Sequence, residues 1–301
     1  MSEIRFDDRV AVITGAGGGL GKTYALELAR RGAKVVVNDL GVSVDGTGAS
    51  TSMADQTVEE IRKAGGTAVA NYDSVATPES GARIVQTALD HFGRVDIVIN
   101  NAGILRDRSF AKLTPEDLEA VLDVHLKGAF YVTQPAFRYM KEHGYGRIVF
   151  TSSGAGIFGN FGQTNYGAAK MGLVGLMHVL AVEGAKYNIK CNAIAPTART
   201  RMTENLLGPL AELVAPETVT PLVVYLCSER CELTHEIFSC GGGRFARIFI
   251  GVTPGWVAPR GKPISAEDVE AHLEEIRKLD GFIVPQSITD ELQLIMKALK
   301  G

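Results

Sequence analysis

Short apolar runs rich in β-branched residues alternate with longer stretches in which apolar residues recur every three or four positions. Several of the runs are apolar at consecutive positions, which is typical of strands covered on both faces. The stretches between them, such as 55–63 and 80–92, have the spacing of amphipathic helices. The pattern predicts seven strands, at 10–14, 34–39, 67–72, 95–100, 147–152, 189–194 and 236–240.

This alternation predicts an α/β fold, namely a doubly wound, Rossmann-type sheet of seven parallel strands with helices on both faces. Right-handed crossovers place the carboxyl ends of all the strands at one edge, where such sheets bind ligands. Polar residues that directly follow a strand are therefore candidates for one shared site.

Two segments interrupt the alternation. Residues 41–50 are mostly small and make a longer connection than usual after the second strand, so we expect a surface insertion there. The alternation stops after Gly243, which predicts a sheet domain at 1–243 and a C-terminal helical extension at 244–301.

The extension contains two helical patterns. Ser265 followed by Asp268 predicts a capped helix start, and a second helix is expected to begin near Ser287. Each has an apolar stripe that needs cover. The sequence leaves open whether the chain's own sheet or a neighbouring subunit supplies it. The stripes consist of Val269, Leu273, Ile276 and Leu279, and of Leu292, Ile295, Met296 and Leu299.

Composition excludes several classes of protein. The chain has 301 residues, of which 46% are hydrophobic and 22% charged, as in folded domains. Its 31 Lys and Arg against 34 Asp and Glu leave a net charge of −3, so no overall basic field favours nucleic acid. Any anionic ligand must be bound by local features.

The N-terminal residues, the longest apolar stretch and the cysteines together predict where the protein is located. The first seven residues carry acids and no apolar segment follows them, which is unlike a signal peptide. The longest apolar stretch, 171–182, is about half of the ~20 residues that a membrane span needs, so membrane insertion is not expected. The four cysteines form no CxxC pair, which predicts reduced thiols without a metal and a cytoplasmic protein.

A glycine-rich segment at 14–21 directly follows the first strand and opens a helix. Glycines let backbone amides approach a pyrophosphate, and the helix N-terminus adds about half a positive charge. Its spacing is Gly-x-x-x-Gly-x-Gly, and a glycine turn without a ligand is the alternative. The candidate dinucleotide contacts in it are Gly15, Gly19, Leu20 and Gly21.

Asp39 ends the second strand, where an acidic residue accepts hydrogen bonds from a ribose diol. A carboxylate there repels a 2′-phosphate, which favours NAD over NADP, although a turn or capping Asp is the alternative. Polar and small residues after the third and fourth strands reach the same edge and are candidates for adenine and strand-stabilising contacts: Asp73, Ser74, Val75, Asn101, Ala102 and Gly103.

Tyr166 and Lys170 are four positions apart at the start of an apolar helical segment. This spacing puts the phenol and the ammonium on one helix face, about 6 Å apart along the axis. We expect the ammonium to lower the phenol pKa, which would make Tyr166 a general acid or base. Ser153 ends the fifth strand, where its hydroxyl can bind a substrate oxygen.

These motifs together resemble the short-chain dehydrogenase/reductase family. The resemblance rests on the glycine pattern at 14–21, Asn-Asn-Ala-Gly at 100–103, Ser153 thirteen residues before Tyr166, and Tyr-x-x-x-Lys. It covers residues 5 to about 243. It implies a dinucleotide-binding and catalytic domain in which Tyr166 moves the proton, Ser153 binds the same oxygen, and Lys170 also holds the nicotinamide ribose.

A narrower group within this family is also similar, namely the (3R)-hydroxyacyl-CoA dehydrogenase units of D-specific, peroxisomal-type multifunctional β-oxidation enzymes. The matching segments are 38–41, 71–75, 103–110, 159–163 and 201–203. Because those units also carry a tail beyond the sheet, the resemblance runs to Gly301. It implies NAD-dependent oxidation of a (3R)-hydroxyacyl-CoA by a stand-alone dehydrogenase, which forms a homodimer or homotetramer.

Two positions depart from the family pattern. His125 occupies the place where most members have a catalytic Asn that holds a relay water, and the sequence leaves a relay or a packing role open. Thr197 replaces a usual Gly, and Thr200 is the candidate for the nicotinamide carboxamide contact. By resemblance, residues 199–213 form a substrate lid.

Other functions remain open at this point. A steroid or steroid-CoA dehydrogenase and a 3-oxoacyl carrier-protein reductase are alternative enzymes, and a scaffold that binds NAD without chemistry is an alternative of another class. The phosphates of an acyl-CoA need basic partners. The candidates in the extension are Arg244, Arg247, Arg260 and Lys262, for which solvated surface charge is the competing interpretation.

Overall fold

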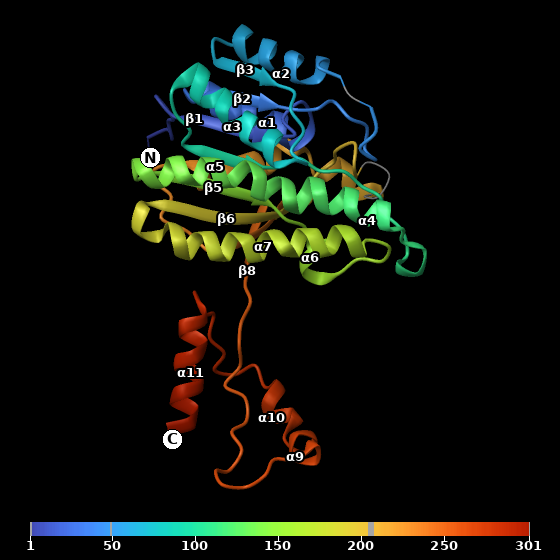
Figure 1. Ribbon diagram of the computed structural model, residues 1–301, viewed down its shortest axis with the longest axis vertical. Helices are drawn as coiled ribbons and strands as arrows, with labels where there is room; N and C mark the ends of the chain where they lie inside the picture. The colour runs from blue at the N-terminus through green and yellow to red at the C-terminus, as the bar shows by residue number, and fades with distance from the viewer. Residues whose placement is uncertain (1, 49, 204–207, 301) are drawn as a thin grey trace. The chain divides into compact units, whose positions relative to one another are not determined.

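One sheet of eight strands forms the centre of the larger part of the protein (Figure 1). The computed structural model describes residues 2–48, 50–203 and 208–300. The strands of this sheet are β1 Val10–Thr14, β2 Lys34–Asn38, β3 Thr67–Asn71, β4 Ile97–Asn100, β5 Gly146–Thr151, β6 Ile189–Pro196, β7 Ile237–Gly241 and β8 Arg244–Ile248.

The spatial order of the strands is β3-β2-β1-β4-β5-β6-β7-β8. The strands from β1 to β7 pair in parallel, and Val12 on β1 lies between Val36 on β2 and Val98 on β4. The order reverses direction at β1 and β4, so a crevice is expected at their carboxyl ends. This confirms the predicted doubly wound sheet and the edge on which its motifs converge.

The predicted count of seven strands is wrong, because β8 follows β7 through a two-residue turn. Gly242 and Gly243 have φ of 57° and 78°, the left-handed conformation that such hairpin turns require. A strand joined in this way runs antiparallel to its neighbour. The sequence signal is weak because β8 is short, charged and largely exposed, with Phe245 at 46% exposure.

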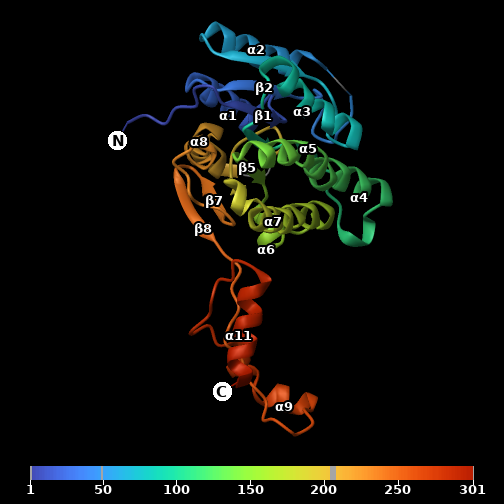
Figure 2. The ribbon, with the colours of Figure 1, turned by 60° about the vertical axis from the view of Figure 1, so that its left-hand side comes forward.

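Helices cover both faces of the sheet (Figure 2). α1, α2 and α8 pack together on one face, and α3, α5 and α7 lie on the other. The helices are α1 Gly19–Arg30, α2 Ser52–Lys63, α3 Pro78–Phe92, α4 Pro115–Leu122, a π-helical turn at Asp123–Lys127, α5 Gly128–His143, α6 Gly154–Phe158, α7 Thr164–Gly184 and α8 Thr220–Cys227.

The central strands are buried along their whole length. All residues of β1 and β4 are buried, which explains why their sequences are apolar at consecutive positions. Tyr24 and Leu28 of α1 and Ile61 of α2 pack onto this core with no more than 1% exposure. Burying a Leu or Ile side chain contributes about 1.5–3 kcal/mol, so the core holds the strand ends in fixed positions.

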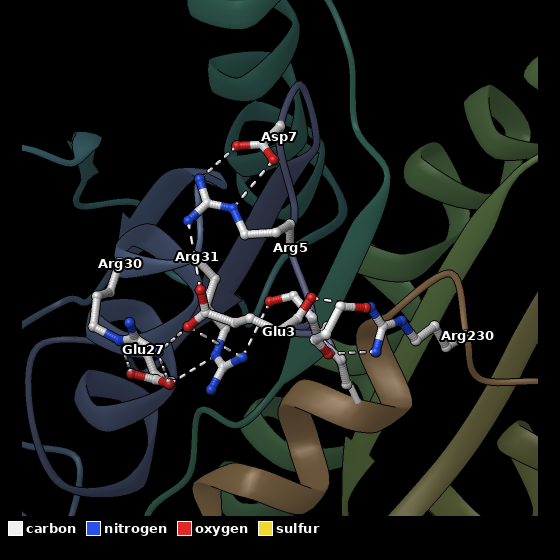
Figure 3. A network of polar contacts seen from close by, with 9 residues as sticks. Glu3, Arg5, Asp7, Glu27, Arg30, Arg31 and Arg230 are labelled. Atoms are coloured by element: carbon white, nitrogen blue, oxygen red, sulfur yellow. Dashed lines mark hydrogen bonds and ion pairs between the residues drawn. The ribbon is translucent and has the colours of Figure 1, made fainter.

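Ion pairs hold the N-terminal segment against the C-terminal end of α1 (Figure 3). Glu3 pairs with Arg30, the last residue of α1, and with Arg31, which follows the helix, and Glu27 pairs with the same two arginines. The guanidinium of Arg230 donates hydrogen bonds to the Ser2 and Glu3 carbonyls at 2.8 and 3.0 Å. Exposed pairs of this kind contribute at most about 1 kcal/mol each, so several of them together are needed to hold the segment in place.

The chain divides into two compact units, Met1–Arg247 and Ile248–Gly301, called here the sheet unit and the tail unit. The tail unit contains α9 Ala266–Ala271, α10 Leu273–Arg277 and α11 Ile288–Lys300. The capping box at Ser265 and Asp268 is present, but the first predicted helix is interrupted at His272. A stack of Trp256 on His272, at 4.0 Å between ring centroids, lies at this break.

Within the described residues, the tail unit has no fully buried side chain. A pair of backbone hydrogen bonds joins Val252 to Ile283, and Phe249 stacks on Phe282. The predicted apolar stripe of α11 is exposed, at 50% for Leu292 and Met296 and 45% for Ile295. The question of what covers this stripe therefore stays open.

Candidate active site

The glycine-rich segment forms a tight turn at the carboxyl end of β1. A Cβ on Gly21 would collide with the Gly15 carbonyl oxygen, and a Cβ on Gly15 would lie 2.9 Å from the Ala102 Cα. Gly19 lies against the Thr200 side chain, so the turn and the loop after β6 meet. Leu20 continues into the first turn of α1. Glycine at these positions therefore lets the turn, the start of α1 and the segment after β4 pack closely together.

Asp39 lies beside this turn. One of its carboxylate oxygens accepts a hydrogen bond from the Gly17 amide at 2.8 Å, and the other accepts from the Gly41 amide at 2.7 Å. Each oxygen retains a lone pair for a further donor. The arrangement fixes the carboxylate at the glycine turn, which is the geometry that recognition of a ribose diol requires.

The residues after β3 have mixed roles. Asp73 pairs with Arg83 at 2.7 Å, and its carbonyl accepts a hydrogen bond from Asn38. The Ser74 hydroxyl accepts from the Ala76 amide. Val75 packs against Gly128 at the start of α5. These contacts shape the edge of the sheet near Asp39, and the predicted adenine contacts of this segment stay a prediction.

The segment after β4 is tied to β1. The Asn101 amide donates to the Thr14 hydroxyl at 3.0 Å, and its side chain donates to the Thr14 and Gly15 carbonyls. The Ala102 amide donates to the same hydroxyl at 3.1 Å. These bonds correspond to the strand-stabilising role predicted for this segment, and they hold the glycine turn in place.

Tyr166 lies in the first turn of α7, and Ser153 caps α6. The Ser153 hydroxyl accepts a hydrogen bond from the Ala155 amide at 3.1 Å, which fixes it at the end of β5. Burial raises the pKa of Tyr166 above its ordinary value, a hydrogen bond with Ser153 lowers it, and the charge of Asp107 raises it. Ser153 and Tyr166 are thus together, as the sequence predicts.

Lys170 lies one turn further along α7, with its Nζ 5.4 Å from the centroid of the Tyr166 ring. Burial lowers the pKa of Lys170 to about 7, so the side chain is only partly charged at neutral pH. Its Nζ donates to the Thr151 carbonyl at 2.6 Å. Burial is the largest cause of the raised Tyr166 pKa, and Lys170 is not among its causes here, so the lowering of this pKa by the Lys170 ammonium stays a prediction.

His125 is 3% exposed and lies in the π-helical turn between α4 and α5. Its Nε2 is 3.0 Å from the Ile104 amide nitrogen and 2.8 Å from the Ile104 carbonyl oxygen. Its ring meets the Tyr166 ring edge-on at 5.1 Å. Burial holds the pKa of His125 well below its ordinary range, so the ring is neutral. The imidazole therefore holds the Ile104 backbone against the Tyr166 ring.

The insertion after β2 reaches the same site. The Val44 carbonyl accepts a hydrogen bond from the Leu105 amide at 2.9 Å, and the Asp45 carbonyl accepts from the Arg106 side chain at 2.9 Å. The Asp45 carboxylate holds the insertion's own turn through Ser43 and Thr47. The predicted surface loop is therefore packed on the residues that follow β4.

Two residues beside Tyr166 were missed as functional candidates. Gln163, at the start of α7, donates to the Asp107 carboxylate at 2.8 Å. Asp107 follows β4 within Arg-Asp-Arg, and one of its oxygens is buried without a partner. A carboxylate between two arginines is ordinary surface charge from sequence alone, so no local pattern marked it.

Other predicted residues lie outside this cluster or outside the described residues. The predicted lid, 199–213, includes 204–207, which the structure does not describe. Arg247 pairs with Glu236 at 3.4 Å, and Arg244 donates to Ser239. Arg260 and Lys262 are exposed in the tail unit. A role in CoA binding stays a prediction for all four basic residues.

The long helix α7, with the turn after it, is the one described segment with the length and apolarity of a membrane span. It covers Thr164–Tyr187, and helices in the cores of soluble proteins have the same properties. It carries Tyr166 and Lys170 and packs on β5 and β6.

All four cysteines are buried free thiols. The described residues contain no group of three or more His, Cys, Asp or Glu that could hold a metal ion.

Comparison with known proteins agrees with this geometry. Residues 9–208 match the family described as short chain dehydrogenase. The chain is 55% identical over 275 residues to a putative short-chain type dehydrogenase/reductase of Mycobacterium tuberculosis, which covers 91% of this chain and 96% of the relative. It is 50% identical over 300 residues to the peroxisomal multifunctional enzyme type 2 of Mus musculus.

The similarity to the mouse enzyme covers 99% of this chain but 40% of that enzyme. The solved structure of full-length peroxisomal multifunctional enzyme type 2 from Drosophila melanogaster is 41% identical, with a TM-score of 0.84. That match covers 99% of this chain and 50% of the Drosophila chain. The chain thus spans half or less of these multifunctional relatives, and the match includes both units.

Proposed function

This chain belongs to the short-chain dehydrogenase family and is an oxidoreductase that acts on a CH–OH group, and from this premise we propose that it oxidises a (3R)-hydroxyacyl-CoA to the 3-oxoacyl-CoA with NAD. The observation that carries the proposal is the position of Tyr166 between Ser153 and Lys170, on the edge that carries the glycine turn.

The residues at the glycine turn fit NAD. Gly15 and Gly21 allow a turn too tight for side chains at those positions, and the N-terminus of α1, which can bind a phosphate, follows directly. The Asp39 carboxylate suits a ribose with two free hydroxyls and repels a 2′-phosphate. In this proposal Asp73, Ser74 and Val75 lie along the adenine, Asn101 to Gly103 line the centre, and Thr200 contacts the carboxamide.

NAD, when bound, supplies the acceptor for the hydride that leaves the carbon bearing the hydroxyl. The chain's own residues handle the proton. Tyr166 removes the hydroxyl proton as general base, and Ser153 donates a hydrogen bond to the oxygen as charge develops on it. Lys170, released from the Thr151 carbonyl, can bind the nicotinamide ribose and stabilise the phenolate as an ammonium.

Two findings support an acyl-CoA as the substrate. The segments at 103–110 and 159–163, which resemble (3R)-hydroxyacyl-CoA dehydrogenase units, lie together beside Tyr166, since the Arg108 amide donates to the Gly162 carbonyl at 2.9 Å. The similarity to the mouse multifunctional enzyme extends through the tail unit. Both features go beyond what the common catalytic residues require.

A spectrophotometric assay tests the proposal. Purified protein with NAD should form NADH from a (3R)-hydroxyacyl-CoA and not from the (3S) form, and NADP should be a poorer acceptor because of Asp39. Tyr166→Phe should reduce turnover by at least about 10²–10⁴-fold, since it removes the general base, while leaving NADH binding intact. Absence of NADH from both enantiomers would refute the substrate assignment.

The same assay separates the alternatives. Activity with hydroxysteroids alone would identify a steroid dehydrogenase, and NADPH-dependent reduction of a 3-oxoacyl carrier protein would identify a reductase. Binding of NADH with no turnover on any substrate would leave a scaffold. Cytoplasmic location and a homodimer or homotetramer stay predictions, which fractionation of cells and light scattering of the purified protein can test.

A further inference from the structure

The described residues of the insertion after β2, 41–48, form a turn of their own. The Ser43 amide donates to the Thr47 carbonyl at 2.9 Å. The carboxylate of Asp45 accepts hydrogen bonds from the Ser43 hydroxyl at 2.6 Å and from the Thr47 amide at 3.0 Å. Asp45 is itself exposed, so its carboxylate closes the turn without being part of a buried core.

Two backbone carbonyls of this turn bind the segment after β4. The Val44 carbonyl accepts a hydrogen bond from the Leu105 amide at 2.9 Å. The Asp45 carbonyl accepts one from Nε of Arg106, also at 2.9 Å. Because the shape of the turn sets the direction of these carbonyls, a change at the Asp45 carboxylate acts on Arg106 through the backbone.

The insertion also packs on Ile104, which is 3% exposed. A Cβ on Gly46 would lie 3.1 Å from the Ile104 Cδ1, so the backbone of the turn lies directly on that side chain. Val42 packs against the buried apolar cluster that contains Ile104, and Tyr166 packs against the same cluster. The backbone of Ile104 in turn contacts His125, whose ring meets the Tyr166 ring edge-on.

A path of hydrogen bonds leads from Arg106 to the first turn of α7. The Arg106 carbonyl accepts from Nδ2 of Asn165 at 3.0 Å, and the Asp117 carbonyl accepts from the same nitrogen at 3.2 Å. Oδ1 of Asn165 accepts from the Tyr166 amide at 2.8 Å. Asn165 is 1% exposed, so these bonds lie in the interior. Arg106 thus joins the insertion by its side chain and α7 by its carbonyl.

The start of α7 depends on such contacts. The first amides of a helix have no acceptor in a preceding turn, and the Tyr166 amide is one of them. Gln163, at the N-cap, makes no side-chain cap hydrogen bond within the described residues. Asn165 supplies the acceptor for Tyr166 instead. The position of the phenol therefore depends on how firmly the Asn165 side chain is held.

We propose that the insertion is a brace that positions the catalytic base, and that Arg106 and Asn165 are the positioning residues that connect the two. This inference rests on the proposed function, in which Tyr166 is the base. The brace holds the first turn of α7 against the segment after β4, so that the phenol stays within reach of the substrate oxygen bound by Ser153. A shift of about 1 Å in such an alignment lowers the rate about 10²-fold.

Steady-state kinetics of the full chain test the connection at Arg106. Arg106→Met removes the donor to the Asp45 carbonyl and should lower kcat about tenfold, because the alignment loosens, while the KM for NAD stays the same. Arg106→Lys keeps a donor and should restore most of the loss. Arg138→Met removes the same charge from an exposed position on α5 and should lose nothing. A wild-type kcat in Arg106→Met would overturn the inference.

A second variant tests the insertion itself. Asp45→Ala removes the carboxylate that closes the turn and should lower kcat about three- to tenfold. Glu116→Ala removes an equally exposed carboxylate from the first turn of α4 and should change nothing. Because both changes interrupt one path, the combined loss in Arg106→Met with Asp45→Ala should be smaller than the product of the single losses. A full product, or a change confined to the KM for NAD, would contradict the brace.

Hydrogen exchange of the full chain without cofactor gives a readout that needs no substrate. Arg106→Met should accelerate exchange of the Leu105 and Tyr166 amides about fivefold, as expected for the loss of one hydrogen bond, while β5 keeps its protection. If the wild type oxidises no (3R)-hydroxyacyl-CoA, the proposed function fails, and this measurement still reports on the brace. Unchanged exchange at Tyr166 in Arg106→Met would refute the inference.

Discussion

The sheet unit and the tail unit stabilise their helices in different ways. In the sheet unit, helices pack on strands such as β4, whose residues are all buried. In the tail unit, α9 starts with a capping box and α11 leaves its apolar stripe about half exposed. The difference shows why Ser153, Tyr166 and Lys170 all lie in the sheet unit, since precise placement of side chains needs a packed core.

Truncation of one aliphatic side chain in each unit should give the largest contrast. Ile99→Ala, at a fully buried position of β4, should lower the free energy of unfolding by about 2–5 kcal/mol, because it leaves a cavity in a packed core. Leu292→Ala, at 50% exposure on α11, should cost less than about 1 kcal/mol in the monomer.

Urea denaturation of both variants measures this contrast. A cost for Leu292→Ala as large as that for Ile99→Ala would mean that the α11 stripe is buried in solution, and its dependence on protein concentration would then identify a neighbouring subunit as the cover.

Lowering the pH should have an intermediate effect on the free energy of unfolding. Burial lowers the pKa of His178 on α7 to about 4, and the adjacent His235 ring, 3.9 Å away, acts in the same direction. Between pH 6.5 and 4 the folded state therefore binds fewer protons than the unfolded state, so stability is lost as pH falls through this range. His178→Gln should flatten this part of the stability profile of the sheet unit.

Thermal melts from pH 7.5 to 4.5 provide the measurement, with His143→Gln as a control on the exposed end of α5. An identical decline in the wild type and in His178→Gln would contradict the assignment.

The smallest effect concerns the cap of α9. Ser265→Ala removes the hydroxyl that accepts from the Asp268 amide at 3.1 Å and should cost about 0.5–2 kcal/mol of local stability. Hydrogen exchange of the α9 amides should accelerate, while the amides of β1 keep their protection, because the two units are separate contact clusters. Equal acceleration in both units would show that they unfold together.

Local pattern predicted most of the fold correctly. Consecutive apolar residues mark strands such as β1 and β4 because both of their faces are covered. The pattern did not predict β8, whose residues are mostly exposed, or the break at His272, where the apolar spacing continues but the helix does not. Both segments are largely exposed, so burial does not impose on them the apolar spacing that identifies a strand or a helix.

In the candidate active site, too, some features follow from local spacing and others depend on contacts between distant segments. Tyr166 and Lys170 share a helix face because of their spacing, and that spacing is present in the sequence. The lowered pKa of Lys170 was not predictable, because it comes from burial of the side chain, whose Nζ donates to the Thr151 carbonyl. The hydrogen bond from Gln163 to Asp107 joins residues 56 positions apart, and the side chains of Arg106 and Arg108 approach Asp117, which no local pattern indicated.

By itself, the sequence determined the alternating architecture, the glycine turn with Asp39, and the residue types of the catalytic group, because each depends on neighbours within a few positions. Only the tertiary structure decided the eighth strand, the neutral state of His125, the packing of the insertion on Leu105 and Arg106, and the hydrogen bond from Gln163 to Asp107. The physical reason is that charge states and hydrogen-bond partners depend on burial, and burial is set by segments distant in the chain.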